Sequence, residues 1–246
     1  FTINAMAKDD NGRIIDPYGG RVDLKNKIFK HASPAFEEDP LRVLRFARFK
    51  SYKQLHDFYL HEETKILFDK IVASTELKDL SPERVWMETK KALENNFSDQ
   101  FFETLIQYHL TDPWFKNLKS VSCDGDLPEL KWADMQRINQ FQLCASLPVP
   151  NSFIKVLESL KQVINLVDCK NKSEKLGLVE KMQVPRNYQI LMHCKQYESL
   201  NEHRDYLEKI FQSVMAIDFS VLAGVNESEV SNQKQLLYHE ALQEII

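Results

Sequence analysis

Glycine is scarce in this chain, and its distribution limits the folds that the chain can adopt. Only 6 of the 246 residues are glycine, and three of them, Gly12, Gly19 and Gly20, lie within the first 20 positions. Tight turns between strands commonly need glycine, so a glycine-poor chain with 15 phenylalanines favours helices packed on helices. Hydrophobic residues make up 43% and charged residues 28%, which excludes disordered, collagen-like and coiled-coil chains.

The first 20 residues are predicted to form the last hairpin of a sheet. Thr2–Ala7 is apolar and β-branched, and a second apolar run follows the Asn11-Gly12 pair, which favours a hairpin turn. Asp16–Gly20 is predicted to form a second turn. Because the chain does not begin with methionine, we expect the other strands of this sheet to precede Phe1.

Helical periodicity dominates the remainder, so we expect a mainly α fold: a small β-hairpin remnant followed by an elongated array of helices. Two helix starts are well marked, because Asp39 precedes Pro40 and Ser81 precedes Pro82, which places a capping side chain before proline at the first helical position. The predicted helices span residues 22–31, 40–53, 61–74, 82–95, 98–109, 130–146, 150–168, 172–182, 186–197, 201–215 and 227–246.

Cysteine spacing and hydropathy exclude several classes of protein. The four cysteines lie more than 20 residues apart, so we expect neither a zinc motif nor a disulfide framework, and we expect a reducing cytoplasm. No apolar run approaches the roughly 20 residues of a membrane helix.

The net charge of −4 is unevenly spread. Residues 1–60 contain 11 lysines and arginines against 8 acidic residues, and the segment between Pro40 and His56 contains five cationic residues and no acidic one. A net-acidic protein with one concentrated basic stretch is consistent with a local polyanion or nucleotide site.

The basic stretch coincides with the helix predicted from Pro40. At 100° per residue, its three arginines fall within about 120° of one another. The opposite side is predicted to be buried, and it consists of Val43, Leu44, Phe46 and Ala47. On pattern alone, the arginines simply face solvent. Hydrogen-bonding capacity allows a second interpretation, in which the Asp39 carboxylate and the Arg42 guanidinium match a nucleobase edge, leaving Arg45 or Arg48 for phosphates or stacking.

Four motifs, in one order and spacing, resemble the class II tRNA nucleotidyltransferases, which are the bacterial CCA-adding enzymes. This family belongs to the same superfamily as the bacterial poly(A) polymerases. The resemblance covers residues 1–95, and a weaker likeness covers the stretch from Leu222 to Leu242. The motifs are Thr-Ile-Asn-Ala from Thr2, Asp-Pro-Tyr-Gly-Gly-x-x-Asp from Asp16, Glu-Asp-Pro-Leu-Arg-x-x-Arg-x-x-Arg from Glu38, and Ser-Pro-Glu-Arg-x-x-x-Glu from Ser81.

The resemblance implies a nucleotide-binding set. Asn4 matches a residue that helps to bind the ribose and triphosphate. Asp39 and Arg42 match a protein template pair that reads C or A by Watson–Crick-like hydrogen bonds. Arg45 and Arg48 belong to the same motif and complete the expected nucleotide-binding residues.

The resemblance also implies supporting residues. A flexible motif is expected to couple the catalytic head to the neck during the switch from CTP to ATP, and it consists of Asp16, Gly19, Gly20 and Asp23. Glu38 and Arg45 would orient the template pair. Glu83 and Arg84 would brace the template helix, or serve only as ordinary first-turn helix charges.

The implied domains are the end of a nucleotidyltransferase head (residues 1–30), a helical neck (31–120) and a helical body and tail (121–246) that holds tRNA. The boundary between the neck and the body is placed in the predicted linker, residues 120–130. In this region, the stretch from Leu143 to Leu147 looks like a phosphohydrolase signature that has lost its His-Asp pair.

The resemblance implies template-independent addition of C, C and A to the 3′ end of tRNA from CTP and ATP. The reaction needs Mg²⁺, whose carboxylate ligands we expect before Phe1, so we expect no catalytic or metal-binding residue in this chain and no activity from it alone. The stretch from His31 to Phe36 is more similar to the corresponding stretch of the CCA-adding enzymes than to that of the poly(A) polymerases. The alternatives are a poly(A) polymerase, an enzyme that adds only A or only C, and a non-catalytic helical RNA-binding fragment.

Overall fold

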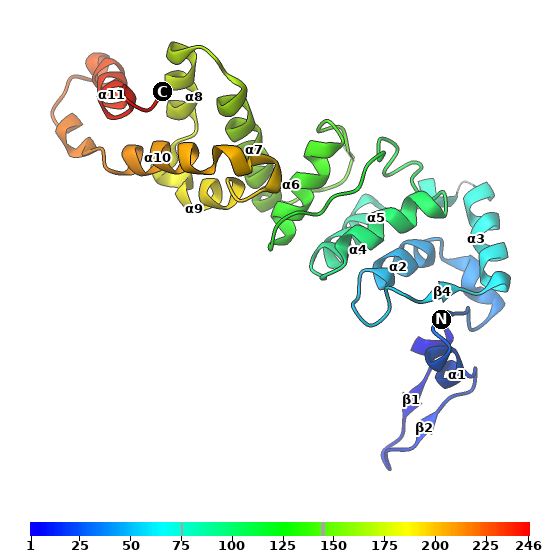
Figure 1. Ribbon diagram of the computed structural model, residues 1–246. Helices are drawn as coiled ribbons and strands as arrows, with labels where there is room; N and C mark the ends of the chain where they lie inside the picture. Colours follow the sequence, from blue (N-terminus) through cyan, green and yellow to red (C-terminus); the bar gives the residue numbers. More distant parts are fainter. Residues whose placement is uncertain (75, 144–145) are drawn as a thin grey trace. The chain divides into compact units, whose positions relative to one another are not determined.

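The structure is a computed structural model that describes residues 1–74, 76–143 and 146–246. The chain divides into two compact units, of which the first comprises Phe1–Cys123 and Asp134–Val149 and the second comprises Asp124–Ala133 and Pro150–Ile246. Helices dominate both units and the described strands are only two residues long, so the expected mainly α class is confirmed (Figure 1). The three-part division expected from sequence stays a prediction.

The described part of the first unit contains short strands, 3-10 turns and five complete α-helices. Its strands are β1 (Ala7–Lys8), β2 (Ile14–Ile15), β3 (Ile28–Phe29) and β4 (Tyr59–Leu60). Its 3-10 turns are η1 (Thr2–Asn4), η2 (Pro34–Glu38) and η3 (Glu76–Asp79). Its α-helices are α1 (Gly20–Lys25), α2 (Leu41–Lys50), α3 (Glu62–Ser74), α4 (Pro82–Leu93) and α5 (Ser98–Gln107).

The predicted hairpin forms, but it is shorter than expected. Strands β1 and β2 pair antiparallel, and the Asp9 carboxylate accepts hydrogen bonds from the backbone N–H groups of Asn11 and Arg13 across the loop. The expectation of a strand from Thr2 is wrong, because η1 begins there. Thr2 and Ile3 are buried in η1, and the packing of these side chains outweighs the β preference of the sequence.

The predicted helix over residues 22–31 is wrong in its second half. Helix α1 ends at Lys25, and Lys27 adopts a positive φ of 58°. The following residues form β3, which pairs in parallel with β4. Because β4 lies some 30 residues later in the sequence, local periodicity could not reveal this pairing.

Helix α2 is the centre of the first unit, where it packs against α4 and α5. The apolar face predicted for it is confirmed, since Val43, Leu44, Phe46 and Ala47 are each at most 1% exposed. Helix α2 begins at Leu41, one residue later than predicted. The cap predicted for α4 is confirmed, because the Ser81 hydroxyl accepts from the backbone N–H of Arg84 at 3.4 Å.

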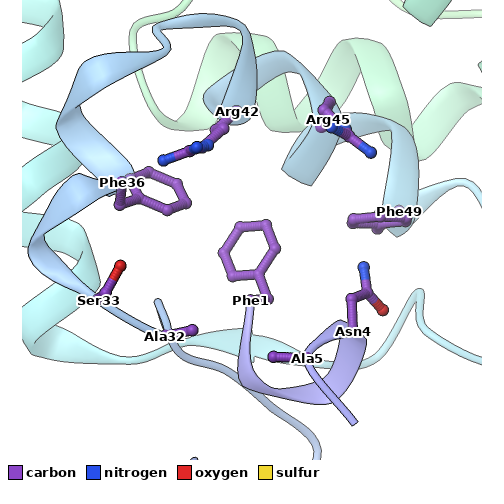
Figure 2. Close-up of a pocket in the computed structure, with 9 residues that line it drawn as sticks. All are labelled: Phe1, Asn4, Ala5, Ala32, Ser33, Phe36, Arg42, Arg45 and Phe49. Carbon is purple, nitrogen blue, oxygen red and sulfur yellow. The ribbon is translucent and has the colours of Figure 1, made fainter. Parts of the chain in front are cut away.

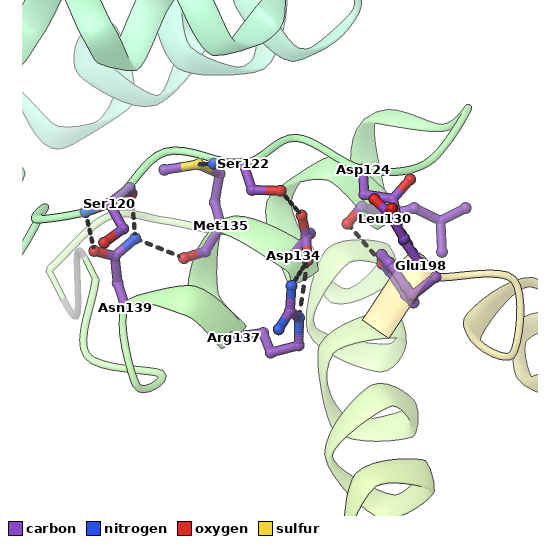
Figure 3. A network of polar contacts seen from close by, with 10 residues as sticks. Ser120, Ser122, Asp124, Leu130, Asp134, Met135, Arg137, Asn139 and Glu198 are labelled. Atoms are coloured by element: carbon purple, nitrogen blue, oxygen red, sulfur yellow. Dashed lines mark hydrogen bonds and ion pairs between the residues drawn. The ribbon is translucent and has the colours of Figure 1, made fainter. Parts of the chain in front are cut away.

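Helix α6 (Pro128–Ile138) carries a buried polar network on its second half, within the first unit (Figure 3). The Asn139 side chain accepts from the N–H groups of Lys119 and Ser120 and donates to the carbonyls of Ser120 and Met135. These bonds hold the extended segment 119–122 along the helix and satisfy backbone groups that no sheet or helix pairs.

The second unit is all helical. Its elements are α7 (Asn151–Asp168), α8 (Lys172–Lys181), α9 (Val184–Cys194), η4 (Glu198–His203), α10 (Arg204–Met215), η5 (Phe219–Leu222) and α11 (Glu227–Leu242). Helix α7 packs against α8 and α9, and α10 packs against α9 and α11. The Tyr197 hydroxyl donates to the Leu130 carbonyl at 2.6 Å, and Asp124 accepts from the backbone N–H of Glu198. Across the described residues of both units, no helix has the length and apolarity that crossing a membrane requires.

Candidate nucleotide-binding site

A cavity of about 300 Å³ lies in the first unit, between η1, the segment before α2, and α2 itself (Figure 2). It combines aromatic walls with cationic and amide side chains, a composition that suits a ligand with both a flat ring and negative charge. Its lining residues are Phe1, Asn4, Ala5, Ala32, Ser33, Phe36, Arg42, Arg45 and Phe49. Asn4, Arg42 and Arg45, three of the residues expected from sequence, therefore meet in one place.

Helix α2 supplies the two arginines of this cavity from successive turns. The Arg42 guanidinium lies 5.8 Å from the centroid of the Phe36 ring and donates a hydrogen bond to the Ala35 carbonyl. Arg45 is exposed to solvent at the cavity. The two positive side chains make this cavity attractive to an anion such as a phosphate.

Asp39, the expected partner of Arg42, does not line the cavity. Its carboxylate accepts from the N–H of Leu41 at 3.2 Å, and both of its oxygens lie 3.0 Å from Nη2 of Arg84. Arg84 therefore contacts the start of α2, where sequence reasoning placed a brace. Two other supporting residues, Glu38 and Glu83, are exposed.

The expected supporting residues of the first 23 positions converge on η1, which carries Asn4. Asp16 accepts from the N–H groups of Gly20 and Arg21 at 2.7 and 2.9 Å, and the bond from Arg21 is the main cause of a lowered Asp16 pKa. A Cβ atom on Gly20 would lie 2.3 Å from the Thr2 carbonyl oxygen, so only glycine fits there.

Gly19 and Asp23 complete this arrangement. Gly19 precedes α1 with a φ of +74°, a left-handed conformation that glycine adopts at little cost. Asp23 accepts from the Thr2 hydroxyl at 2.6 Å. The bond from Thr2 to Asp23 joins α1 to the turn that places Asn4 at the cavity.

The segment between β3 and α2 forms the opposite wall of the cavity. The backbone N–H of His31 donates to the Thr64 hydroxyl at 3.0 Å, and the His31 ring nitrogen Nδ1 lies 2.9 Å from the same oxygen. Burial lowers the pKa of His31 below its usual value. Helix α3, which carries Thr64, thereby anchors the wall that contains Ser33 and Phe36.

The expected exposure of Arg48 is wrong. Its side chain is 9% exposed, and its Nε lies 3.1 Å from Oε2 of Glu88, which is itself 8% exposed. The guanidinium also covers the rings of Phe49 and Tyr52. A helical wheel separates apolar from polar residues, but only the neighbouring helix α4 could show that a carboxylate faces Arg48. Arg48 is therefore held in a buried ion pair and does not line the cavity.

The sequence did not predict the aromatic walls, and Glu88 appeared only as a motif residue without an assigned role. Phe36 and Phe49 looked like ordinary apolar residues, and only the fold brings them to one cavity. Glu88 did leave a signal, because it lies on the apolar face of α4 with Val85 and Ala92, and a buried carboxylate needs a cation.

Two expectations from the sequence concern metal ligands and a degenerate phosphohydrolase signature. Within residues 1–74, 76–143 and 146–246, no three histidine, cysteine, aspartate or glutamate side chains group as metal ligands. Cys144 and Ala145 of the degenerate phosphohydrolase signature lie outside the described residues.

Comparison with known proteins finds one matching family model and several similar bacterial proteins. Residues 57–121 match a family model described as the probable RNA and SrmB-binding site of polymerase A. The multifunctional CCA protein of Pseudoalteromonas atlantica is 50% identical over 133 residues, which cover 54% of this chain and 32% of that protein. The multifunctional CCA protein of Haemophilus influenzae is 53% identical over 168 residues, which cover 68% of this chain and 36% of that protein. The chain is thus a relative of the bacterial CCA-adding enzymes, which confirms the resemblance inferred from the motifs.

Solved structures show the same fold. The Bacillus stearothermophilus CCA-adding enzyme in complex with CTP gives a TM-score of 0.63 at 21% identity, covering 100% of this chain and 66% of that one. The Thermotoga maritima CCA-adding enzyme complexed with tRNA gives a TM-score of 0.57 at 17% identity. This match covers 100% of this chain and 71% of that one. The sequence matches span about a third of the length of these curated relatives.

Proposed function

We propose that this chain is the nucleotide-selecting part of an enzyme that adds C, C and A to the 3′ end of tRNA from CTP and ATP. The observation that carries the proposal is the aromatic-walled cavity into which Asn4, Arg42 and Arg45 converge. The names of the relatives, and the CTP, ATP and tRNA complexes among the solved structures, support it.

Base selection by Asp39 and Arg42 follows from hydrogen-bonding capacity. Cytosine and adenine each present an amino group beside an unprotonated ring nitrogen, whereas uracil and guanine present a carbonyl beside an N–H. A carboxylate accepts from the amino group, and a guanidinium donates to the ring nitrogen. Although Asp39 already contacts Arg84 and Arg42 already contacts Ala35, each retains unused hydrogen-bonding sites.

The rest of the nucleotide would be held by the other cavity residues. Arg45 is exposed and cationic, as a group that attracts the triphosphate should be. Asn4 offers both an amide donor and an acceptor, which suits the ribose hydroxyls. Neither contact distinguishes one base from another, so these residues contribute affinity rather than selectivity.

The proposed polymer partner is the acceptor end of tRNA, held by phosphate contacts in the helical body, and the proposed location is the cytoplasm. The family-model match over residues 57–121 supports an RNA partner. Affinity for a tRNA transcript should therefore fall as salt rises. The logarithm of the association constant should decrease linearly with the logarithm of the salt concentration. An affinity that does not change between 50 and about 200 mM salt would contradict this mode of binding.

Nucleotide selection is tested by titrating the chain with CTP, ATP, UTP and GTP in a calorimeter. We expect CTP and ATP to bind about 5- to 150-fold more tightly than UTP and GTP. Asp39→Ala and Arg42→Ala should bring the four affinities together, while Ile154→Ala, at an exposed position of the second unit, should leave them unchanged. Equal affinities in the unaltered chain would contradict the proposal.

Nucleotide addition is tested on a tRNA transcript that ends just before CCA. The chain alone is compared with the chain fused behind the residues that precede the matched segment in the Haemophilus influenzae relative. The fusion should add two C and then one A. A long A tail would instead indicate a poly(A) polymerase, and silence from the fusion would favour a helical RNA-binding protein.

A further inference from the structure

We propose that Phe36 is a positioning residue for base selection, because its ring and the adjacent Ala35 carbonyl hold the Arg42 guanidinium in the orientation that meets the nucleobase. This inference deepens the proposed function and rests on it, since it requires Arg42 to read the base. It assigns specificity to a residue that contributes no polar group of its own.

The Arg42 guanidinium contacts both the Phe36 ring and the Ala35 carbonyl. The Arg42 guanidinium carbon lies 5.8 Å from the Phe36 ring centroid, while its Nη1 donates to the Ala35 carbonyl oxygen. Both contacts come from η2, on consecutive residues. An arginine side chain has several rotatable bonds, and these two contacts together restrict both the plane and the direction of its head group.

The second step is that Phe36 is itself held in place. Its ring is 4% exposed and lies 5.3 Å from the Phe1 ring and 5.9 Å, nearly parallel, from the Phe68 ring on α3. Close packing of this kind leaves an aromatic ring little freedom to turn. The surface that supports Arg42 is therefore part of the aromatic core.

The third step is the charge of Arg42 compared with that of its neighbours. Arg48 is paired with Glu88, and Arg84 is paired with Asp39. For Arg42, the contacts found within the described ranges are a carbonyl and an aromatic ring, neither of which neutralises its charge. The fold thus orients this guanidinium without supplying a carboxylate to compete with the base.

The consequence is a selective loss of base discrimination when the ring is removed. The triphosphate contact proposed for Arg45 and the ribose contact proposed for Asn4 do not depend on Phe36, so CTP should still bind. Because a cation–π contact is worth about a 3- to 30-fold change in an equilibrium constant, the preference for CTP over UTP should fall by that factor.

The test compares Phe36→Leu and Phe36→Met, which lack the ring, with Phe36→Tyr, which keeps it. Phe102→Leu is the matched control, because Phe102 is a buried phenylalanine of the first unit that contacts Phe101 and Phe115 and does not line the cavity. Calorimetry measures CTP and UTP affinity, and NMR of the Arg42 Nε–H group reports ring-current shift and mobility. The second ring-free variant guards against one that fails to fold.

We expect both ring-free variants to lose the Arg42 ring-current shift and most of the preference for CTP, while Phe36→Tyr and Phe102→Leu retain both. An unchanged preference in the ring-free variants, or an equal loss in Phe102→Leu, would overturn the role of Phe36 alone. If the unaltered chain binds CTP and UTP equally, the proposed function fails and this inference fails with it, whatever the NMR signal shows.

Discussion

The guanidinium of Arg84 donates to both carboxylate oxygens of Asp39, with Nη2 3.0 Å from each, although the two residues are 45 positions apart. Arg84 lies in the first turn of α4 and Asp39 lies just before α2. The contact therefore orients the carboxylate that is proposed to accept from the amino group of C or A. The contact thus links the start of α4 to the start of α2.

Loss of this contact should affect selection more than stability. In Arg84→Ala, the free energy of unfolding should fall by less than about 1 kcal/mol, because the pair is partly exposed to solvent. The preference for CTP over UTP should fall severalfold, because the carboxylate loses its orientation. Urea unfolding and calorimetry measure the two quantities. Lys161→Ala, which removes a surface pair of the second unit, should change neither, and an unaltered preference in Arg84→Ala would contradict the expectation.

The buried pair between Arg48 and Glu88 should behave in the opposite way. Glu88→Ala leaves a buried guanidinium without its carboxylate, which should lower the free energy of unfolding by about 3–5 kcal/mol. The double variant Arg48→Met, Glu88→Leu should be much less destabilised, because it removes both charges and retains apolar volume. Urea unfolding of Glu88→Ala, of Arg48→Met and Glu88→Leu singly, and of the double variant measures these changes. Additive losses would show that the two side chains contribute independently.

The close approach of Gly20 to Thr2 predicts an asymmetry between two glycines. Gly20→Ala should disrupt η1, because the new Cβ would lie 2.3 Å from the Thr2 carbonyl oxygen. Gly177→Ala is the matched control, since no atom lies within 4 Å of its added Cβ in helix α8. The control should gain up to about 1 kcal/mol of stability. Thermal unfolding and CTP titration measure both effects, and equal behaviour of the two variants would contradict the structural reason.

The lowered pKa of Asp16 predicts a pH dependence of stability. Backbone N–H groups of Arg21 and Gly20 stabilise the ionised carboxylate in the folded state, so its folded pKa lies below the ordinary aspartate value of 3.8. This contribution should be fully present above pH 3.8 and should disappear as the pH falls through the folded pKa. The difference in unfolding free energy between the unaltered chain and Asp16→Ala should therefore shrink in acid. A difference that stays constant from pH 5 down to about pH 2 would contradict this.

Local signals predicted the helices well, because the physics that forms them is local. Periodic apolar residues, the cap at Ser81 and the prolines at helix starts are contained within a few turns of chain. The wheel of α2 correctly predicted its buried side. The likeness of the motifs to the CCA-adding enzymes was also readable, because the motifs are short and ordered along the sequence.

The errors occurred where distant segments decide the local structure. Residues 2–4 form a 3-10 turn instead of a strand, because Thr2 bonds to Asp23 and to the backbone of Lys30. Residues 28–29 form a strand instead of a helix, because β4 pairs with them. In both cases, tertiary contacts outweigh a weak local propensity.

The sequence by itself determined a mainly helical protein, the buried face of α2 and the motifs that relate it to the CCA-adding enzymes. Only the tertiary structure decided which charge meets which partner. Arg42 lies on an aromatic ring, Arg48 is buried against Glu88, and Arg45 remains exposed, although the three are evenly spaced on one helix. The reason is that spacing along a helix sets direction alone, whereas the energy of a charge depends on the groups that other elements bring within a few ångströms.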